Sequence, residues 1–327
     1  MAAAEEGLPL VIGVDGGGSR CAAVIARLPP AGDQALKIIG RGQGGPANPR
    51  VAGHDLARAS ITEAIAGAFA DAGIGIRPVE GVCLALAGVG RTEDRDAVLA
   101  WATQSRFGAR VQVVPDGVVA FADGAADPWG VVLIAGTGSL ALARDRGVGL
   151  VSDAATDRAG GWGPLLGDEG SGHAIGLAAL KAAMRMADGR GPETILLAAV
   201  MRRFEAGEPA DLVGRLHAAN VGRREIANVA REVLAAADVG DPVATAITAS
   251  AAADLAAHVR TLAHRHAFAA GVYPLRMVGG LLTGSAAFRR RVVESLTATG
   301  HDPGTITIVA DPAAAAARLA AAELSAL

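Results

Sequence analysis

Cysteine, lysine and aromatic residues are scarce in this sequence. The chain has 327 residues, of which two are cysteines, Cys21 and Cys83, and two are lysines, Lys37 and Lys181. Aromatic residues make up 3%, too few for a surface that binds nucleic acid by stacking on its bases. The cysteines have no metal-ligand spacing and lie in apolar runs, so we expect them to pack as small buried side chains.

Strong net charge and long apolar runs are also missing. The formal net charge is −3, which gives no sign of a nucleic-acid or membrane surface. No apolar run reaches the length of a membrane span, and residues 1–6 lack the basic and apolar regions of a signal peptide. We therefore expect a soluble, cytoplasmic protein. Its length and its 51% hydrophobic content suffice for two domains.

Apolar runs and helical periodicity predict an α/β protein in which one order of elements occurs twice. In each half, three β-segments come first and α/β units follow, although no short-period sequence repeat is present. Asp241 and Asp311 each precede a proline, a pattern that starts helices. Helices are expected at 53–72, 93–107, 242–267 and after 311, with a mostly helical insertion over 171–268 and a helix that follows Gly279 and runs to about 299. Strands are expected at 9–15, 20–28, 36–41, 81–86, 110–114, 131–134, 139–144, 147–151, 275–278 and 306–309.

A glycine-rich hairpin follows the first strand. The strand ends in Asp15, and Gly16, Gly17, Gly18 and Ser19 connect it to a second strand at once. Such a loop lets backbone amides converge on an anion. It matches neither the G-x-x-x-x-G-K-[ST] loop nor the dinucleotide-binding motif, which precede helices. An ordinary turn explains this stretch alone equally well.

Two further glycine loops occur later in the chain. Residues 134–139 repeat the hairpin pattern, with glycines and hydroxyls at Gly136, Thr137, Gly138 and Ser139. Two such hairpins favour a pair of loops that hold a phosphate chain, over two unrelated turns. The third loop joins a strand to a helix and contains Gly279, Gly280 and Gly284. Its glycines leave room for a planar base or ribose, and a close-packed turn is the equal alternative.

The three loops, in this order, resemble the ATP site of the actin-like, sugar-kinase and Hsp70 ATPase fold, which is ribonuclease H-like. From about residue 9 onward the chain resembles the BadF/BadG/BcrA/BcrD ATPase family, in particular its N-acetylglucosamine kinase members. The resemblance implies two lobes with ATP in the interlobe cleft. The N-terminal lobe is expected at 1–117, with the helix at 311–327 packing back on it, and the C-terminal lobe at 118–310. The two hairpins would hold the phosphates of ATP, and Gly279, Gly280 and Gly284 would flank its adenosine.

Two aspartates are candidates for the chemistry. Asp116 ends a strand, where α/β sheets place their ligand crevice, and a helix N-cap explains it equally well from the residues alone. The resemblance implies that it contacts the sugar and is the catalytic base that accepts the proton of the attacking hydroxyl. Asp15 would repel phosphate unless a cation lay between them, so with the family likeness we favour Mg²⁺, held directly or through water. A turn-forming aspartate is the alternative.

The resemblance also implies the sugar contacts. Asn48 is expected to contact the sugar, although a turn-terminating Asn would be the default without the family. The stretch G-W-G-P-L-L-G-D-E-G-S at 161–171 resembles a signature of the N-acetylglucosamine kinases, in which Gly161 and Asp168 contact the sugar. Trp162 shapes the acetamido pocket or packs in the core, and we favour packing. Glu169 is expected to cap the next helix.

Arg91 and the cluster His264–His266 are expected to be solvated.

The function expected from this likeness is ATP-dependent phosphorylation of the 6-hydroxyl of N-acetylglucosamine, by a homodimer. A glucosamine or muramyl-sugar kinase is the nearest alternative. An ATPase activator of a 2-hydroxyacyl-CoA dehydratase is disfavoured because both cysteines lie inside strands, where they would not bridge subunits through an iron–sulfur cluster. A non-catalytic sugar sensor would need an added helix-turn-helix, for which the residues before Val11 leave no room. Zinc-containing sugar kinases are excluded by the missing cysteine cluster.

Overall fold

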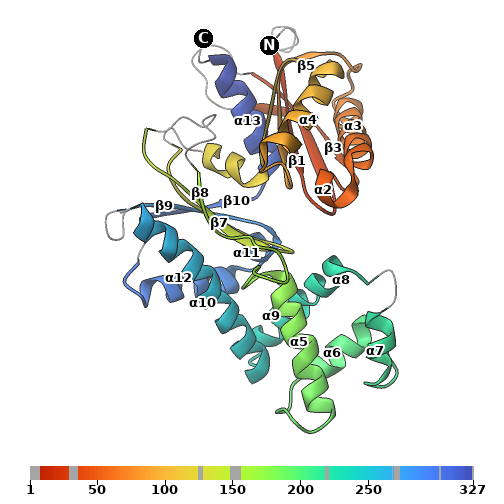
Figure 1. Ribbon diagram of the computed structural model, residues 1–327, viewed down its shortest axis with the longest axis vertical. Helices are drawn as coiled ribbons and strands as arrows, with labels where there is room; N and C mark the ends of the chain where they lie inside the picture. The colour runs from red at the N-terminus through yellow and green to blue at the C-terminus, as the bar shows by residue number, and fades with distance from the viewer. Residues whose placement is uncertain are drawn as a thin grey trace. The chain divides into compact units, whose positions relative to one another are not determined.

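The chain divides into two compact units. The computed structural model describes residues 8–28, 36–123, 128–147, 156–217, 221–266, 268, 273–301 and 303–325. Unit 1 comprises residues 1–128, 149–151 and 311–327, and unit 2 comprises residues 129–148 and 152–310. Each unit contains one five-stranded sheet with helices packed on it (Figure 1).

The sheet of unit 1 has the strand order β3-β2-β1-β4-β5. An antiparallel meander comes first, because β1 pairs with β2 and β2 pairs with β3, and the parallel strands β4 and β5 extend the sheet on the other side of β1. Apolar side chains such as Ile12, Ile25 and Leu84 are fully buried, and each stabilises the fold by roughly 1.5–3 kcal/mol relative to an exposed position. The strands are β1 (Leu10–Gly16), β2 (Cys21–Arg27), β3 (Lys37–Gly44), β4 (Val79–Leu86) and β5 (Gly108–Pro115).

Helices from both ends of the chain cover this sheet. Helix α3 packs on β2 and β3, whereas α13 packs on β1 and β4, so the blue helix of Figure 1 lies beside the red strand. The side chain of Asp311 starts α13 by accepting a hydrogen bond from the amide of Ala314 at 3.0 Å. The helices are α2 (Pro49–Ala52), α3 (His54–Asp71), α4 (Thr92–Gln104), the 3-10 helix η1 (Asp116–Ala122) and α13 (Pro312–Ser325).

The contact between α13 and β1 depends on a glycine. A Cβ on Gly13 would collide with the backbone of Ala313 and Ala317, so only glycine lets the helix lie this close to the strand. On the helix side the contact is made by small side chains, and residues 313–317 are all buried alanines. The alanine run therefore forms a helix, as its helical propensity predicts, and its small side chains let this helix pack closely on β1.

The sheet of unit 2 repeats the arrangement of unit 1. Its order is β10-β9-β6-β7-β8, with β6, β7 and β8 antiparallel and β9 and β10 parallel to β6. The twofold element order expected from the sequence is thereby confirmed. The strands are β6 (Gly130–Ala135), β7 (Ser139–Arg144), β8 (Asp157–Gly160), β9 (Pro274–Val278) and β10 (Thr305–Val309).

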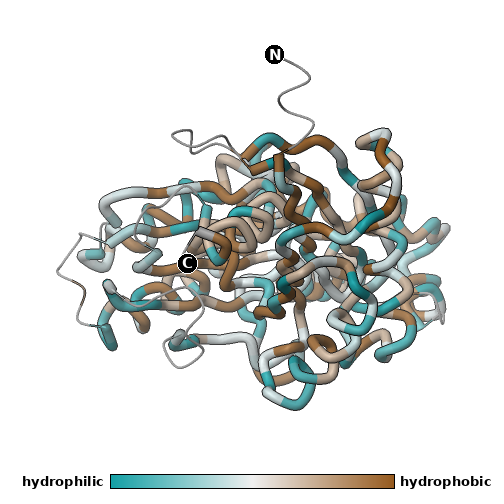
Figure 2. Tube along the Cα trace, turned by 90° about the horizontal axis from the view of Figure 1, so that it is seen from above, coloured by the Kyte–Doolittle hydropathy of each residue, from teal (hydrophilic) through white to brown (hydrophobic). Residues whose placement is uncertain are grey.

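The helices of unit 2 form one large core with its sheet. The long helix α10 contacts β6, β7 and β8, and it also contacts α5, α9 and α12. Apolar stretches, brown in Figure 2, alternate with teal polar ones along the chain. In the described part of the chain, no helix is long and apolar enough to span a membrane. The helices are α5 (Gly172–Ala187), α6 (Leu196–Arg203), α7 (Asp211–Leu216), α8 (Arg223–Asn228), α9 (Ala230–Asp238), α10 (Pro242–Arg265), α11 (Gly280–Gly284) and α12 (Ala286–Thr297).

Some expected elements differ from the structure. Strand β8 was not expected, and most of the strand expected at 147–151 lies outside the described residues. The single helix expected to reach residue 299 is two helices, because Ser285 is extended (φ −127°, ψ 107°) and its hydroxyl accepts the amide of Phe288 at 3.1 Å, which starts α12 anew. The helix expected at 93–107 ends at Gln104, because Ser105 is its C-cap and Arg106 has φ +54°, which a right-handed helix does not allow.

Candidate functional site

The turn between β1 and β2 binds two neighbouring loops of unit 1 through its backbone. The amides of Ala47 and Asn48 donate to the carbonyl oxygen of Gly17, at 3.0 and 3.1 Å. The amide of Ala87, just after β4, donates to the carbonyl of Gly16 at 2.8 Å. These bonds bring the loop of Asn48 and the end of β4 against the first glycine loop.

The outer part of this turn is open. Gly18 is exposed and a Cβ there would meet nothing within 4 Å, whereas a Cβ on Gly16 would clash with Leu86 and Ala47. Gly16 is therefore required by packing, and the space beside Gly18 is free. The roles of Gly16, Gly17, Gly18 and Ser19 toward phosphate remain predictions.

Asn48 both caps a helix and lies beside a glycine that makes room for it. Its Oδ1 accepts the amide of Arg50 at 3.0 Å, as the N-cap of α2. A Cβ on Gly88 would collide with this side chain, and Gly88 has φ +87°, a region that favours glycine. The cap uses only the oxygen, so within the described residues the Nδ2 group keeps its donors for a ligand.

Asp15 and Asp116 are electrostatically coupled carboxylates in unit 1. Burial, together with the negative charge of Asp116, raises the pKa of Asp15 to about 7, while Arg20 opposes the shift. Burial also raises the pKa of Asp116, although its carboxylate accepts the amide of Gly117 at 3.0 Å. Asp116 is the first residue of η1 and Pro115 is its N-cap, so the N-cap interpretation of Asp116 is not met. The charge of Asp116 acts on Asp15, and a common ligand for the two remains a prediction.

The turn between β6 and β7 rests on the start of α5 in unit 2. The amide of Gly136 donates to the carbonyl of Gly138 at 2.9 Å, which closes the turn. The amides of Gly172 and His173 donate to the carbonyls of Gly136 and Thr137, at 2.8 and 3.3 Å. The second hairpin is therefore present as expected, with its carbonyls turned toward α5.

Asp168 and Ser139 are bonded to each other and to their surroundings. The carboxylate of Asp168 is buried, forms an ion pair with Arg223 and accepts the amide of Ser139 at 3.2 Å. The hydroxyl of Ser139 donates to the carbonyl of Glu169 at 2.6 Å. Both side chains thus join the segment 161–171 to the second glycine loop. The predicted contacts of Asp168 and Gly161 with sugar, and of Ser139 with phosphate, remain predictions.

A pocket of about 580 Å³ brings the second and third glycine loops together. Gly136 and Thr137 form part of its wall, and Gly280 and Gly284 form another part. A Cβ on Gly136, Gly280 or Gly284 would meet nothing within 4 Å, so these glycines leave open space. Gly279 lies just behind, against Ala135. Four predicted nucleotide-binding residues therefore line one cavity.

Helices α8 and α9 supply the opposite wall, which the sequence interpretation missed. Their lining residues recur at helical spacing and combine apolar with charged side chains. The sequence contains no motif at these positions. Their helical spacing within the predicted helical insertion is the feature that could have indicated them. They are Ala227, Asn228, Ala230, Arg231, Leu234, Ala235 and Asp238.

Three expectations about side chains were wrong. Trp162 does not pack in the core of its unit: it is 65% exposed, with the guanidinium of Arg158 4.6 Å from its ring centroid. Glu169 does not cap α5, because the hydroxyl of Ser171 accepts the amide of Ala174 at 3.2 Å and fills that role. His266 is not solvated, since its side chain is 13% exposed and bonds to Asp145 at 2.9 Å.

Both cysteines are buried in strands, as expected, and Arg91 is exposed. The structure brings together Asp15 and Asp116 in unit 1. In unit 2 it brings together the second and third glycine loops, and it also joins Asp168 to Ser139 of the second loop.

Two solved structures with the same architecture are named as sugar kinases, one of them provisionally. A protein of Chromobacterium violaceum, provisionally named an N-acetylglucosamine kinase, superimposes with a TM-score of 0.69 at 24% identity, over 95% of this chain and 99% of that one. The ROK hexokinase of Thermus thermophilus superimposes with a TM-score of 0.56 at 16% identity, over 96% and 99% of the two chains. The repeated sheet and these likenesses define the actin-like sugar-kinase fold, as the sequence predicted.

The chain belongs to the BadF/BadG/BcrA/BcrD ATPase family, whose sequence profile matches residues 12–316. It is similar to the N-acetylmuramic acid/N-acetylglucosamine kinase of Clostridium acetobutylicum, with 31% identity over 252 residues, which are 77% of this chain and 78% of that one. The resemblance inferred from the glycine loops is thereby confirmed.

Proposed function

We propose that this protein transfers the γ-phosphoryl group of ATP to the 6-hydroxyl of N-acetylglucosamine. The observation that carries the proposal is the pocket of unit 2, because its walls contain four of the glycine-loop residues predicted to bind nucleotide. The related protein of C. acetobutylicum is named for this sugar and for N-acetylmuramic acid, so the muramyl sugar is the second candidate substrate.

Asp116 would act as the general base. It accepts the proton of the 6-hydroxyl while the hydroxyl oxygen forms a bond to the γ-phosphorus and the bond from that phosphorus to the β-bridging oxygen breaks, so that ADP leaves. Its raised pKa suits this task, since a base works best when its pKa approaches the pH of the reaction. Asn48, Gly161, Trp162 and Asp168 would orient the sugar.

The donor set near Asp15 fits Mg²⁺. Two coupled carboxylates with raised pKa values would be stabilised by a cation. Mg²⁺ is usually held by one or two carboxylates together with substrate phosphates and water, so the described residues need no cluster of three acidic or histidine ligands, and none is found among them. Asp15 would hold the ion directly or through water. The ion would supply positive charge to the phosphates.

The two cysteines do not support the alternative function, an ATPase activator of a 2-hydroxyacyl-CoA dehydratase. Cys21 and Cys83 are 1% and 0% exposed, and burial raises the pKa of both thiols, that of Cys21 to about 11. Iron–sulfur clusters need accessible thiolates, so an activator that shares a cluster between subunits is disfavoured. An anaerobic absorption spectrum without a brown chromophore would agree with this.

A coupled assay of ADP release over a hexosamine panel tests the function. The amino sugars of the panel are N-acetylglucosamine, glucosamine and N-acetylmuramic acid, with glucose as the hexose that lacks nitrogen. The highest kcat/KM is expected for N-acetylglucosamine. Absence of sugar-stimulated ADP release with every member would refute the kinase activity, and so would full activity of Asp116→Ala.

A homodimer and a cytoplasmic location are further parts of the proposal, supported by the family resemblance and by composition. Light scattering of the purified chain tests the homodimer, and cell fractionation tests the location.

A further inference from the structure

Helix α10 holds a buried histidine against the segment that carries the predicted sugar contacts. His258 is 9% exposed, and its Nδ1 lies 2.7 Å from the carbonyl oxygen of Asp254, one turn earlier. A carbonyl oxygen only accepts hydrogen bonds, so Nδ1 carries a hydrogen, and Nε2 also carries one in the charged form of the ring, which is the form that pairs with a carboxylate. The other ring nitrogen, Nε2, lies 3.7 Å from Oε2 of Glu169. The imidazole thus has a fixed orientation, with one nitrogen facing a carboxylate.

Both ends of the segment 160–170 rest on the same side of α10. A Cβ on Gly160, which has φ +76°, would collide with the imidazole of His258. A Cβ on Gly170 would lie 2.7 Å from Cγ of Leu255. Residues 255 and 258 are three apart, so they lie on one face of the helix. The tip between these ends is exposed, with Trp162, Leu165 and Leu166 at 65%, 90% and 75%.

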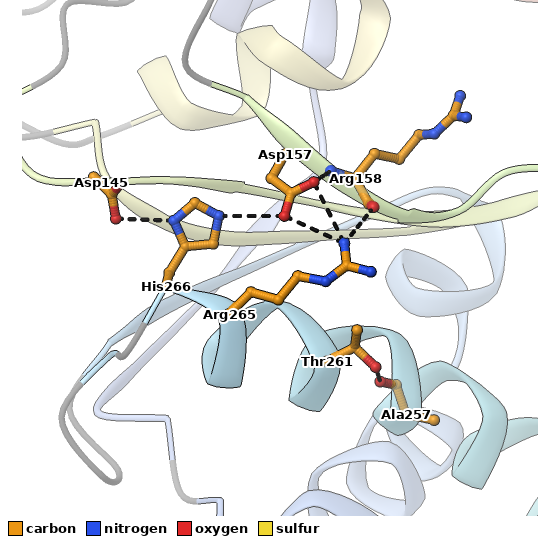
Figure 3. Close-up of polar contacts among 7 residues, drawn as sticks. All are labelled: Asp145, Asp157, Arg158, Ala257, Thr261, Arg265 and His266. Atoms are coloured by element: carbon orange, nitrogen blue, oxygen red, sulfur yellow. Dashed lines mark hydrogen bonds and ion pairs between the residues drawn. The ribbon is translucent and has the colours of Figure 1, made fainter.

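The C-terminal end of α10 fastens the strand from which this segment departs (Figure 3). Arg265 forms an ion pair with Asp157, the first residue of β8, at 3.3 Å. The imidazole of His266 lies between Asp145 and Asp157, with Nδ1 2.9 Å from the first carboxylate and Nε2 3.7 Å from the second. The start of β8 is held in this way, and the segment 160–170 leaves from its other end, at Gly160.

Glu169 joins this helix to the second glycine loop. Its side chain faces His258, while its backbone carbonyl accepts the hydroxyl of Ser139 at 2.6 Å. The preceding residue, Asp168, accepts the amide of Ser139. A shift of Glu169 would therefore move a predicted sugar residue and disturb the predicted phosphate loop.

We propose that His258 is a positioning residue for amino-sugar recognition, which acts through Glu169 to hold residues 160–170 in their binding arrangement. The part of the inference that concerns the amino sugar rests on the proposed function. The contact between His258 and Glu169 does not depend on that function. Glutamine at position 258 would still offer a donor to Glu169 in place of Nε2. Asparagine would still offer a donor to the Asp254 carbonyl, but it is too short to reach Glu169. His264, exposed on the same helix, is the matched control.

Hydrogen exchange of the purified full chain tests the holding contact without substrate. In His258→Ala and His258→Asn, amides of residues 160–170 are expected to exchange about tenfold faster than in the wild type. In His258→Gln and His264→Gln, the exchange rates of the same amides are expected to stay within twofold of the wild-type rates. Unchanged exchange in His258→Ala, or equal acceleration in His258→Gln, would overturn the proposal. If His258→Ala does not fold, the comparison of His258→Asn with His258→Gln tests the proposal, because faster exchange is expected only in His258→Asn.

Steady-state kinetics then separate positioning from general damage. The KM for the amino sugar is expected to rise about tenfold in His258→Asn and in Glu169→Ala, and by more than the KM for ATP, which is affected only through the bonds of Ser139 to this segment. The double variant is expected to be no worse than either single variant, because both remove the same contact. An equal rise of both KM values would overturn the proposal. If the wild type phosphorylates no hexosamine, the proposed function fails, and the exchange result alone decides the positioning role.

Discussion

The side chain of Asn48 occupies the space that a Cβ on Gly88 would need. Asn48 follows β3 and Gly88 follows β4, so two loops that are far apart in the sequence meet at this point. The same Asn48 is bound through its backbone amide to the carbonyl of Gly17 in the first glycine loop. The position of this amide side chain is therefore set by three loops at one edge of the sheet of unit 1.

Gly88→Ala is expected to displace Asn48. The new methyl group would collide with the Asn48 side chain, and alanine at φ +87° is strained, so we expect a loss of about 1–2 kcal/mol in stability and a KM for the sugar raised about tenfold. The KM for ATP should change little. Gly90→Ala is the control, because a Cβ there would meet nothing within 4 Å. Sugar kinetics of Gly88→Ala equal to those of Gly90→Ala would contradict the assignment of Asn48.

Asp116→Asn is expected to lower kcat by 10²- to 10⁴-fold, the usual contribution of a general base. The KM values for sugar and ATP should stay within a few-fold, because the amide has the same shape. In the wild type, kcat should fall as the pH drops through the raised pKa of Asp116, since the protonated carboxyl cannot accept a proton. The residual rate of the variant should lose this acidic limb. A pH profile of kcat for both proteins, with exposed Asp96→Asn as control, is the measurement.

Asp15→Asn is expected to stabilise the protein in the absence of Mg²⁺ and nucleotide. Burial and Asp116 raise the pKa of Asp15 from 3.8 to about 7, so the native state binds this proton more tightly than the unfolded state does. Wild-type stability should therefore decline as the pH rises from about 4 to 7, whereas the variant should not show this decline. Above pH 7 we expect the variant to be more stable by on the order of 1–3 kcal/mol. Urea unfolding at pH 5 and pH 8 measures the difference in stability between the variant and the wild type. A stability gain of the variant that is larger at pH 5 than at pH 8 would contradict a raised pKa of Asp15.

Gly284→Leu is expected to fill the pocket of unit 2. A Cβ at this position would meet no neighbour within 4 Å, so the fold should tolerate a side chain there, while the leucine would occupy space predicted to hold adenosine. We expect the KM for ATP to rise at least tenfold and the KM for the sugar to change little. Gly214→Leu is the control, because Gly214 is equally open but does not line this pocket. Nucleotide binding measured by calorimetry should show the same difference between the two variants.

The sequence was sufficient for the two sheets and their glycine turns, because these depend on local patterns. Apolar runs of five to eight residues are typical of buried strands, and a glycine loop between adjacent runs predicts a hairpin. The same reasoning missed β8, whose residues Asp157–Gly160 are polar and small. It also joined α11 and α12, since a capping serine inside a helical pattern resembles an ordinary helix residue.

The partners of individual side chains were less predictable. Helical periodicity indicated that α10 would be long, but nothing local to His258 or His266 shows that acidic residues from other segments face them. The wall formed by α8 and α9 was missed for the same reason, because a pocket arises from segments distant in sequence. The glycines were informative because each marks a place where the backbone or a neighbour leaves no room for a side chain, or where a ligand needs that room.

The packing of α13 against Gly13 of β1 has a consequence for folding during translation. Strand β1 emerges early from the ribosome, but the helix that covers it comes after the whole of unit 2 in the chain. Unit 1 therefore cannot finish its core during translation of its own first segment, whereas unit 2 is synthesised almost without interruption. A released chain that ends at residue 310 should contain a protease-resistant unit 2 and a protease-sensitive unit 1.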